Sequence, residues 1–187
     1  MNSVISQCDD FLSPDICNQI IAIADEQGWE KAGLLGEQRE GYRIADSMWL
    51  RNTDGRFTEL KQSVASLTET PIENQEDMHI TRYPVGGQYK EHMDYFHKGT
   101  EYYENAIKLG GQRDKSVLIY LNDNFSGGET YFPVLGIKIQ PKTGRLIVWN
   151  NLNEDGEPNP DTIHAGLIVE SGIKYLLSIW IRERSRL

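Results

Sequence analysis

The sequence predicts a mainly β fold with helices in its N-terminal part, in which a jelly-roll barrel is braced by those helices. Helical spacing of apolar residues is confined to about residues 1–77, whereas short runs rich in β-forming residues fill about residues 78–187. Turn-forming sequences such as Ser126-Gly127-Gly128 separate these runs. No linker-like stretch interrupts the 187 residues, so we expect a single domain spanning residues 1–187.

The first expected helix begins at Ser13-Pro14. Serine can accept a hydrogen bond from an exposed amide of the first turn, and proline at the first helical position loses no hydrogen bond. Apolar residues then recur at helical spacing until Gly28 ends the run, and we expect this face to contact the core. Its members are Ile16, Ile20, Ile23 and Ala24.

A second helix is expected near Phe57 to Leu67, with Thr53 or Asp54 as its N-cap. Its apolar residues also fall at helical spacing, so they are expected to pack against the core. They are Phe57, Leu60, Val64 and Leu67.

Eight strands are expected in the second part of the chain, where β-branched and aromatic residues gather in short runs. Turns that contain glycine or proline separate these runs. The expected strands are 78–83, 89–95, 116–122, 129–132, 137–140, 145–150, 162–169 and 174–182.

The last of these strands alternates between a polar and an apolar face. We expect the apolar face to meet the N-terminal helices and the polar face to line the mouth of the barrel. The apolar residues are Tyr175, Leu177, Ile179 and Ile181, and the polar face carries Lys174, Ser178, Trp180 and Arg182. Burying a lysine without a counter-charge is costly, so Lys174 should meet an anion.

The net charge of −9 and the pI near 4.9 argue against a nucleic-acid or membrane-surface binder, since both partners require a basic face. No run of about 18 apolar residues could span a bilayer, and the first residues lack the features of a signal peptide. Cys8 and Cys17 are too few for a disulfide framework and are expected to be reduced thiols. We therefore expect a cytoplasmic protein, whose oligomeric state the sequence leaves open.

Three residues in the second part of the chain could hold a metal ion. Residues two apart on a strand point to the same face, so His92 and Asp94 can reach one ion from a single strand, and His164 would join them from another. Two imidazoles and a carboxylate leave open positions on an octahedral ion, which suits oxygen-activating Fe(II). Each residue alone has an ordinary explanation as a solvated or hydrogen-bonded side chain, and it is their ordered combination that favours a metal site.

From residue 78 to 182 the chain resembles the prolyl 4-hydroxylase branch of the Fe(II)- and 2-oxoglutarate-dependent dioxygenases. Three segments carry the resemblance. They are Arg82-Tyr83-x-x-Gly86 leading to His92-x-Asp94, then Gly127-Gly128-Glu129-Thr130-x-Phe132-Pro133, and last Gly144 to Arg182, with Trp149-Asn150, His164-Ala165 and a lysine ten residues after that histidine.

The resemblance implies a double-stranded β-helix and an enzyme that uses Fe(II), 2-oxoglutarate and O2, with ascorbate as the reductant. It also implies that His92, Asp94 and His164 are the iron ligands and therefore the catalytic residues.

For the cosubstrate, the resemblance implies that Lys174 pairs with the distal carboxylate of 2-oxoglutarate, with the hydroxyls of Tyr83 and Thr130 as further donors. A lysine supplies a compact charge, whose burial is tolerable once that carboxylate arrives. The ordinary explanations are that Thr130 is a β-forming residue and Tyr83 an aromatic residue of the barrel.

The reaction implied is hydroxylation of proline at C4 in a peptide or protein, with release of succinate and CO2. Trp180 could wall the substrate pocket or simply pack, and Arg182 could touch the substrate or be a solvated surface residue. Residues 166–169 follow His164 where relatives often have a proline, which leaves the substrate open. The alternatives are a hydroxylase of a free amino acid or other small molecule, and a non-catalytic sensor module that binds metal or 2-oxoglutarate.

Two long polar segments, 30–43 and 97–115, are expected to be loops that act as lids over the substrate. A plausible strand at 42–50 follows the first of them. Within the second, His97 has odd spacing from His92 and should face away from the metal, while His79 is expected to be structural.

Overall fold

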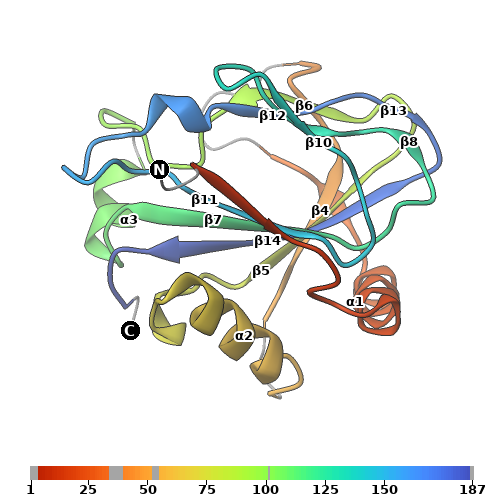
Figure 1. Cartoon of the computed structure of the whole chain (residues 1–187), viewed down its shortest axis with the longest axis horizontal. Coiled ribbons are helices and arrows are strands. Elements are labelled where there is room, and N and C mark those ends of the chain that lie inside the picture. Colours follow the sequence, from red (N-terminus) through yellow and green to blue (C-terminus); the bar gives the residue numbers. More distant parts are fainter. Residues whose placement is uncertain (1–3, 34–39, 52–54, 101, 186–187) are drawn as a thin grey trace.

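The computed structural model describes residues 4–33, 40–51, 55–100 and 102–185, and it confirms the mainly β fold. Two antiparallel sheets face one another as in a jelly roll (Figure 1). In spatial order, the larger sheet contains β1 (Ile5–Cys8), β11 (Leu146–Asn150), β7 (Arg113–Tyr120), β14 (Lys174–Arg182), β5 (Met78–Tyr83), β4 (Asp46–Leu50) and β2 (Glu30–Lys31). The smaller sheet contains β10 (Ile137–Ile139), β9 (Thr130–Phe132), β12 (His164–Gly166), β6 (Gln88–His92) and β3 (Arg43–Ile44).

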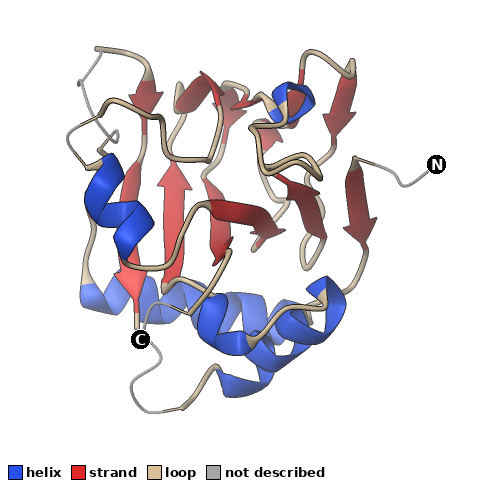
Figure 2. Cartoon of the chain, turned by 90° about the vertical axis from the view of Figure 1, so that its left-hand side faces the viewer, coloured by secondary structure: helices blue, strands red, loops and turns tan. Residues whose placement is uncertain are grey.

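A short third sheet pairs β8 (Ser126–Gly127) with β13 (Val169–Ser171). Among the described strands no pairing joins the two large sheets, so the jelly roll is an open sandwich and not a closed barrel. Two helices, α1 (Pro14–Gln27) and α2 (Thr58–Thr68), lie together beneath the strands in Figure 2. A third, α3 (Tyr103–Lys108), is short, and none of the described helices is long and apolar enough to cross a bilayer.

Helix α1 begins where its sequence predicts, because the Ser13 hydroxyl accepts a hydrogen bond from the Ile16 amide at 3.3 Å. Its buried stripe runs through Cys17, Ile20 and Ala24. Ile16 was expected on this stripe but is 37% exposed, because the neighbouring Cys17 takes the core position one residue later. Cys17 is a free thiol, as expected.

Helix α2 buries Phe57, Leu60 and Val64 as predicted, but Leu67 is 44% exposed. The adjacent Thr68 occupies the buried position of the last turn, where its hydroxyl donates to the Val64 carbonyl at 2.7 Å. The expected caps, residues 53 and 54, lie outside the described residues.

The alternation predicted for the last strand is confirmed in β14. Leu177, Ile179 and Ile181 are fully buried in a core that they share with residues of α1 and α2. On the opposite face, Lys174, Ser178 and Trp180 line a cavity between the two sheets. One strand therefore secures the helices with one face and builds the cavity with the other.

The bounds of β5 and β14 agree with the prediction, but three other expected strands differ: two are divided and one ends early. Segment 42–50 is shared between the sheets, since β3 pairs with β6 whereas β4 pairs with β5. Segment 162–169 divides into a 3-10 turn, Pro160–Thr162, followed by β12 and β13, and segment 89–95 stops at His92. Segment 97–115 was expected to be a loop, yet it contains α3 and the first residues of β7.

Candidate metal centre and cosubstrate cavity

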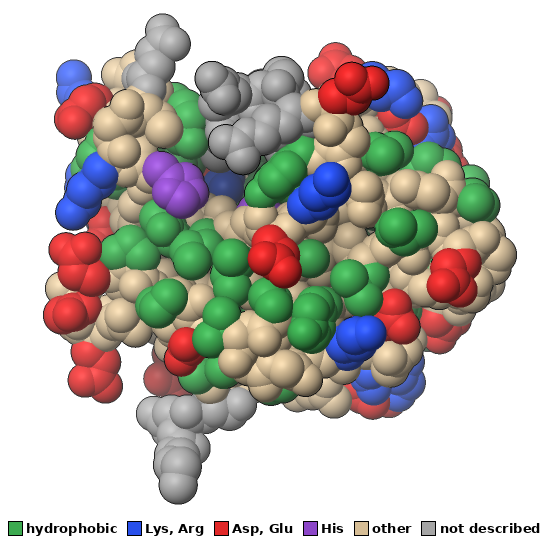
Figure 3. All heavy atoms as spheres, turned by 90° about the horizontal axis from the view of Figure 1, so that it is seen from above, with side chains coloured by type: hydrophobic (Ala, Val, Ile, Leu, Met, Phe, Trp, Pro, Cys, Tyr) green, Lys and Arg blue, Asp and Glu red, His purple; other side chains and the backbone are tan. Residues whose placement is uncertain are grey.

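A cavity of about 830 Å³ opens between the two sheets and contains most of the residues that the sequence singled out. Figure 3 shows the upper face of the molecule, which is hollowed beside a histidine and has a basic side chain in its depth. The cavity walls come from β4, β5, β7 and β14 on one side and from β6, β9 and β12 on the other. The strands of both sheets therefore position the site, and the loops form its mouth.

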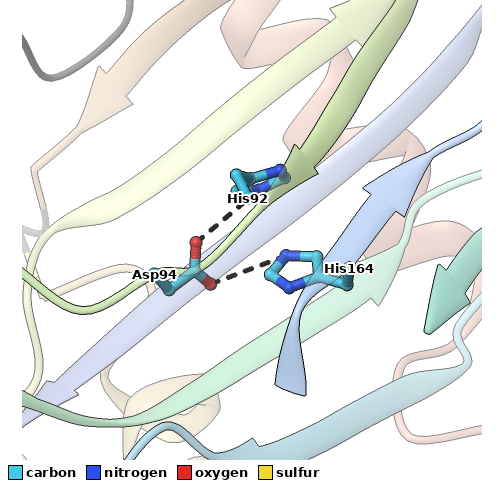
Figure 4. Close-up of side chains that lie close together, drawn as sticks. All are labelled: His92, Asp94 and His164. Atoms are coloured by element: carbon cyan, nitrogen blue, oxygen red, sulfur yellow. Dashed lines mark ion pairs between the residues drawn. The ribbon is translucent and has the colours of Figure 1, made fainter. Parts of the chain in front are cut away.

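His92, Asp94 and His164 converge in this cavity, and their ligand atoms all lie within 4.8 Å of one another (Figure 4). The Nε2 atoms of His92 and His164 lie 3.8 and 3.9 Å from the two oxygens of the Asp94 carboxylate. The two histidines meet because β12 pairs with β6 in a register that places them opposite each other. Asp94 was predicted to share the strand of His92, but β6 ends at His92, and a bend carries the Asp94 carboxylate across to both rings.

Hydrogen bonds behind the three residues fix their orientation. The Nδ1 atoms of His92 and His164 donate to the carbonyl oxygens of Lys90 and Thr162, at 2.7 and 2.9 Å. These bonds select the tautomer whose Nε2 lone pair faces the cluster, as in known metal sites. The arrangement thus fits a divalent metal ion with open coordination positions.

The Asp94 carboxylate has support of its own. The Ser116 hydroxyl donates to Asp94 Oδ2 at 2.6 Å, and it accepts a hydrogen bond from Asn151 Nδ2 at 2.9 Å. Burial would raise the pKa of Asp94, but His164, His92 and the charge of Arg113 outweigh it and hold the pKa below its usual value. Burial lowers the pKa of His92, so the imidazole is neutral. An ionised carboxylate and a neutral imidazole are the protonation states that metal binding requires.

Lys174 closes the inner end of the cavity and is only 1% exposed. Its ammonium group donates to the Gly128 carbonyl at 2.6 Å and lies 5.1 and 5.5 Å from the ring centres of Tyr83 and Tyr120. No carboxylate in the described part of the chain forms an ion pair with it, and burial lowers the pKa of Lys174 to about 7. Gly128, at φ +68°, allows this approach, because a Cβ atom there would lie 3.1 Å from Lys174 Cδ.

Thr130 and Tyr83 lie at this end of the cavity, where the resemblance placed them. Tyr83 is opposite Lys174 in the pairing of β5 with β14. Thr130 Oγ1 is hydrogen-bonded to the hydroxyl of the fully buried Tyr120 at 2.6 Å. Sequence reasoning missed Tyr120, because in an apolar strand a tyrosine has the same pattern as any other core residue.

The outer end of the cavity is aromatic. The rings of Trp49, His79 and Trp180 lie within 6 Å of one another, at 4.6, 5.4 and 5.8 Å between centres. The Arg113 guanidinium stacks 3.8 Å from the centre of the Trp180 ring. Trp180 therefore walls the cavity, as the sequence suggested, whereas Arg113 was not identified from the sequence.

Arg182 is neither in the cavity wall nor at the solvated surface, so both sequence interpretations are wrong. Its side chain is 4% exposed, because Glu76 draws the guanidinium away from the mouth in an ion pair of 3.1 Å.

The polar segments contribute to the cavity mouth. Gly33 and Arg43 line it from the first segment, of which residues 34–39 lie outside the described range. His97 and Tyr102 line it from the second. His97 packs 4.6 Å from the Tyr95 ring and is not part of the metal cluster.

The sequence profile of the 2OG-Fe(II) oxygenase superfamily matches residues 78–182, which is more than half of the chain. That span contains all three residues of the metal cluster together with Lys174. The chain belongs to this superfamily, and it is an oxidoreductase that uses Fe(II), 2-oxoglutarate and O2.

Within the superfamily the chain is similar to prolyl 4-hydroxylases. It is 33% identical to an assigned prolyl 4-hydroxylase of Acanthamoeba polyphaga mimivirus, covering 94% of this chain and 73% of the relative. It is 30% identical to prolyl 4-hydroxylase 1 of Arabidopsis thaliana, covering 94% and 68%. A solved structure of the viral collagen prolyl hydroxylase from Paramecium Bursaria Chlorella virus-1, in complex with 2OG, superposes with a TM-score of 0.76 at 26% identity and covers 97% of each chain.

Proposed function

We propose that this dioxygenase hydroxylates proline at C4 in a peptide or protein, with oxidative decarboxylation of 2-oxoglutarate to succinate and CO2. The observation that carries the proposal is that one cavity holds a metal-binding cluster and, at its inner end, a buried lysine that forms no ion pair with a carboxylate of the described residues. The similarity to prolyl 4-hydroxylases supports the choice of proline as the substrate.

In this proposal His92, Asp94 and His164 hold Fe(II) through two Nε2 atoms and the carboxylate. The metal supplies Lewis acidity and oxygen chemistry that amino-acid side chains lack. The chain contributes orientation, since the carbonyl-bonded Nδ1 atoms and the Ser116 hydroxyl prevent the ligands from turning away.

Lys174 binds the distal carboxylate of 2-oxoglutarate, with the hydroxyls of Tyr83 and Thr130 as further donors. A buried ammonium attracts an anion more strongly than an exposed one, because little water screens the pair. Tyr120 orients the Thr130 hydroxyl through their hydrogen bond. The position of the lysine at the closed end of the cavity thus fixes the direction in which the cosubstrate binds.

The substrate enters from the aromatic end, where Trp180 and its neighbours offer apolar ring faces to a pyrrolidine ring. The open mouth beside His97 and Tyr102 leaves room for the chain on either side of the target proline. These features support a peptide or protein substrate over a free amino acid, which would not need an open mouth.

We retain several predictions from the sequence alongside this proposal. They are a single domain, a cytoplasmic location, ascorbate as the reductant, and the absence of nucleic-acid or membrane partners.

A direct test is to incubate the purified protein with Fe(II), 2-oxoglutarate and ascorbate, together with proline-containing peptides, matched peptides with alanine in place of proline, and free amino acids. Mass spectrometry should find one added oxygen on proline in the peptides and none in the Asp94→Ala variant. Rapid conversion of a free amino acid, with untouched peptides, would favour the small-molecule hydroxylase instead. Slow succinate release that no substrate accelerates would favour the sensor module.

A further inference from the structure

We propose that Arg182 is a positioning residue: it does not line the cavity, but it holds in place the residues that form the substrate end of the cavity. This inference rests on the proposed function and names a determinant of substrate binding within it. Arg182 is the last residue of β14, at the opposite end of that strand from Lys174. It does not line the cavity, and its hydrogen bonds to Gly111, Ala106 and Glu76 lead away from the metal cluster, so we expect it to affect catalysis through these partners.

The guanidinium group of Arg182 joins two distant parts of the chain. Its Nε and Nη2 atoms donate to the Gly111 carbonyl at 3.0 and 2.6 Å, and Nη2 also donates to the Ala106 carbonyl. Its Nη1 atom donates to Glu76 Oε1 at 3.1 Å. Ala106 lies in α3 and Gly111 in the turn that follows, so Arg182 fastens the α3 segment to the body of the protein. These hydrogen bonds hold α3, in the middle of segment 97–115, against the end of β14.

Glu76 is shared with a second arginine. Arg113 donates to both carboxylate oxygens of Glu76, at 2.9 and 2.8 Å. The exposed fractions of Glu76, Arg113 and Arg182 are only 5%, 7% and 4%. The Phe96 ring lies against both guanidinium groups, 4.7 Å from that of Arg182 and 4.9 Å from that of Arg113. Because the two guanidinium groups share one carboxylate, the positions of all three side chains depend on one another. Loss of either arginine changes the charge balance of the two groups that remain.

Arg113 connects this cluster to the cavity. Its guanidinium lies 3.8 Å from the centre of the Trp180 ring, and its Nη1 atom donates to the backbone carbonyl of Asp94 at 3.3 Å. A second connection runs through α3, since Tyr102 lines the cavity just before that helix begins. Arg182 is thus linked through Arg113 to Trp180 and through α3 to Tyr102, and by positioning these cavity residues it affects how the substrate meets the metal centre.

The test compares kinetic constants for the two ligands. Arg182→Met removes the guanidinium group but keeps an unbranched apolar side chain, and it leaves Glu76 and Arg113 as a neutral ion pair. We expect the KM for a proline peptide to rise about tenfold, because small misplacements of a substrate wall have effects of this size. Part of the 2-oxoglutarate turnover should become uncoupled from hydroxylation, while the KM for 2-oxoglutarate stays unchanged. Arg182→Lys keeps one charged contact and should fall between the variant and the wild type.

Arg145→Met is the matched control. Arg145 also bonds a carboxylate and a carbonyl, those of Asp9 and Gln140, but it lies outside the cavity wall. It should therefore lose stability without changing either KM. If Arg182→Met and Arg182→Lys shift both KM values together, or leave the peptide KM as Arg145→Met does, Arg182 has only a structural role.

A readout that is independent of the substrate is cleavage by trypsin after Lys108, in α3, under native conditions. We expect this cleavage to be about tenfold faster in Arg182→Met, since α3 opens locally once its fastening is lost, and unchanged in Arg145→Met. Unchanged cleavage in Arg182→Met would overturn the inference whatever the substrate is. Failure of the wild-type protein to oxidise any peptide would instead overturn the proposed function, and it would be seen without any variant.

Discussion

The two ends of the cavity both contain buried cations, but these cations differ in the partners that balance their charge. At the outer end, Arg113 donates two hydrogen bonds to the Glu76 carboxylate, which also neutralises part of the charge of Arg182. At the inner end, Lys174 has a single backbone carbonyl and two aromatic rings, and the described residues offer it no ion pair. Since an uncompensated buried charge is costly, we propose that an anionic ligand balances the charge at the inner end, whereas the carboxylate of Glu76 balances part of the charge at the outer end. A buried cation therefore indicates a ligand site only where it forms no ion pair with a carboxylate of the protein.

The largest effect is expected from changes in the metal cluster, because both the cosubstrate at the inner end and the substrate at the outer end depend on the metal ion. Asp94→Ala removes the carboxylate between the two imidazoles and should lower peptide-dependent succinate formation on the order of 1,000-fold, with loss of Co(II) binding. Asp10→Ala, at an exposed carboxylate paired with Lys142, should have no such effect. Full activity of Asp94→Ala would show that the ligand set is wrong.

The inner end alone should respond to Lys174→Met. Because the distal carboxylate of 2-oxoglutarate would lose its counter-charge, we expect the KM for 2-oxoglutarate to rise about 100-fold, which corresponds to about 2.7 kcal/mol. The KM for the peptide should not change. Lys142→Met, at a surface lysine paired with Asp9 and Asp10, is the control. An unchanged requirement for 2-oxoglutarate in Lys174→Met would remove the lysine from this role.

The inner end should also be sensitive to pH. In the folded protein without ligand the pKa of Lys174 is about 7, against 10.5 for an ordinary lysine, because burial disfavours the charged form. Above pH 7 the anion must therefore bring a proton with it, so affinity for 2-oxoglutarate should fall by up to about tenfold per pH unit. The ligand-free protein should gain stability over the same range, since only the unfolded chain still binds that proton. Calorimetric titrations at several pH values check this, and Lys174→Arg, which stays charged, should flatten the dependence.

A smaller effect is expected behind the metal cluster. Ser116→Ala removes the hydrogen bond to Asp94 without touching either end of the cavity, and metal affinity should weaken about tenfold. The KM for 2-oxoglutarate should change little once the metal is saturating. Ser126→Ala, which loses a comparable contact with Ser171 at the surface, is the matched control. Equal Mn(II) affinities in the two variants would show that Ser116 does not support the cluster.

The sequence was informative where function depends on local pattern. The spans of β5 and β14 follow from their β-forming residues and, in β14, from alternation, and the convergence of His92 and His164 follows from strand pairing. The bend that carries Asp94 could not be foreseen, because a strand end that depends on tertiary contacts leaves no periodic signal.

Arg182 was misread for a related reason. Its partner Glu76 lies 106 residues earlier in the chain and outside any regular strand. No local sequence pattern predicts an ion pair between residues so far apart. Trp180 and Arg113 show the same contrast, because the alternation of β14 placed the first in the wall whereas the role of the second depends on Glu76. Residues whose roles depend on distant charge partners need the structure.

The most direct test of this account is a calorimetric titration of 2-oxoglutarate into four anaerobic samples: wild type and Lys174→Met, each with and without Mn(II). If the metal ion and Lys174 bind opposite ends of 2-oxoglutarate, only the metal-loaded wild type will bind it tightly. Loss of the metal ion or of the lysine will weaken binding about 100-fold or more. Equal affinity of metal-loaded wild type and Lys174→Met would contradict it.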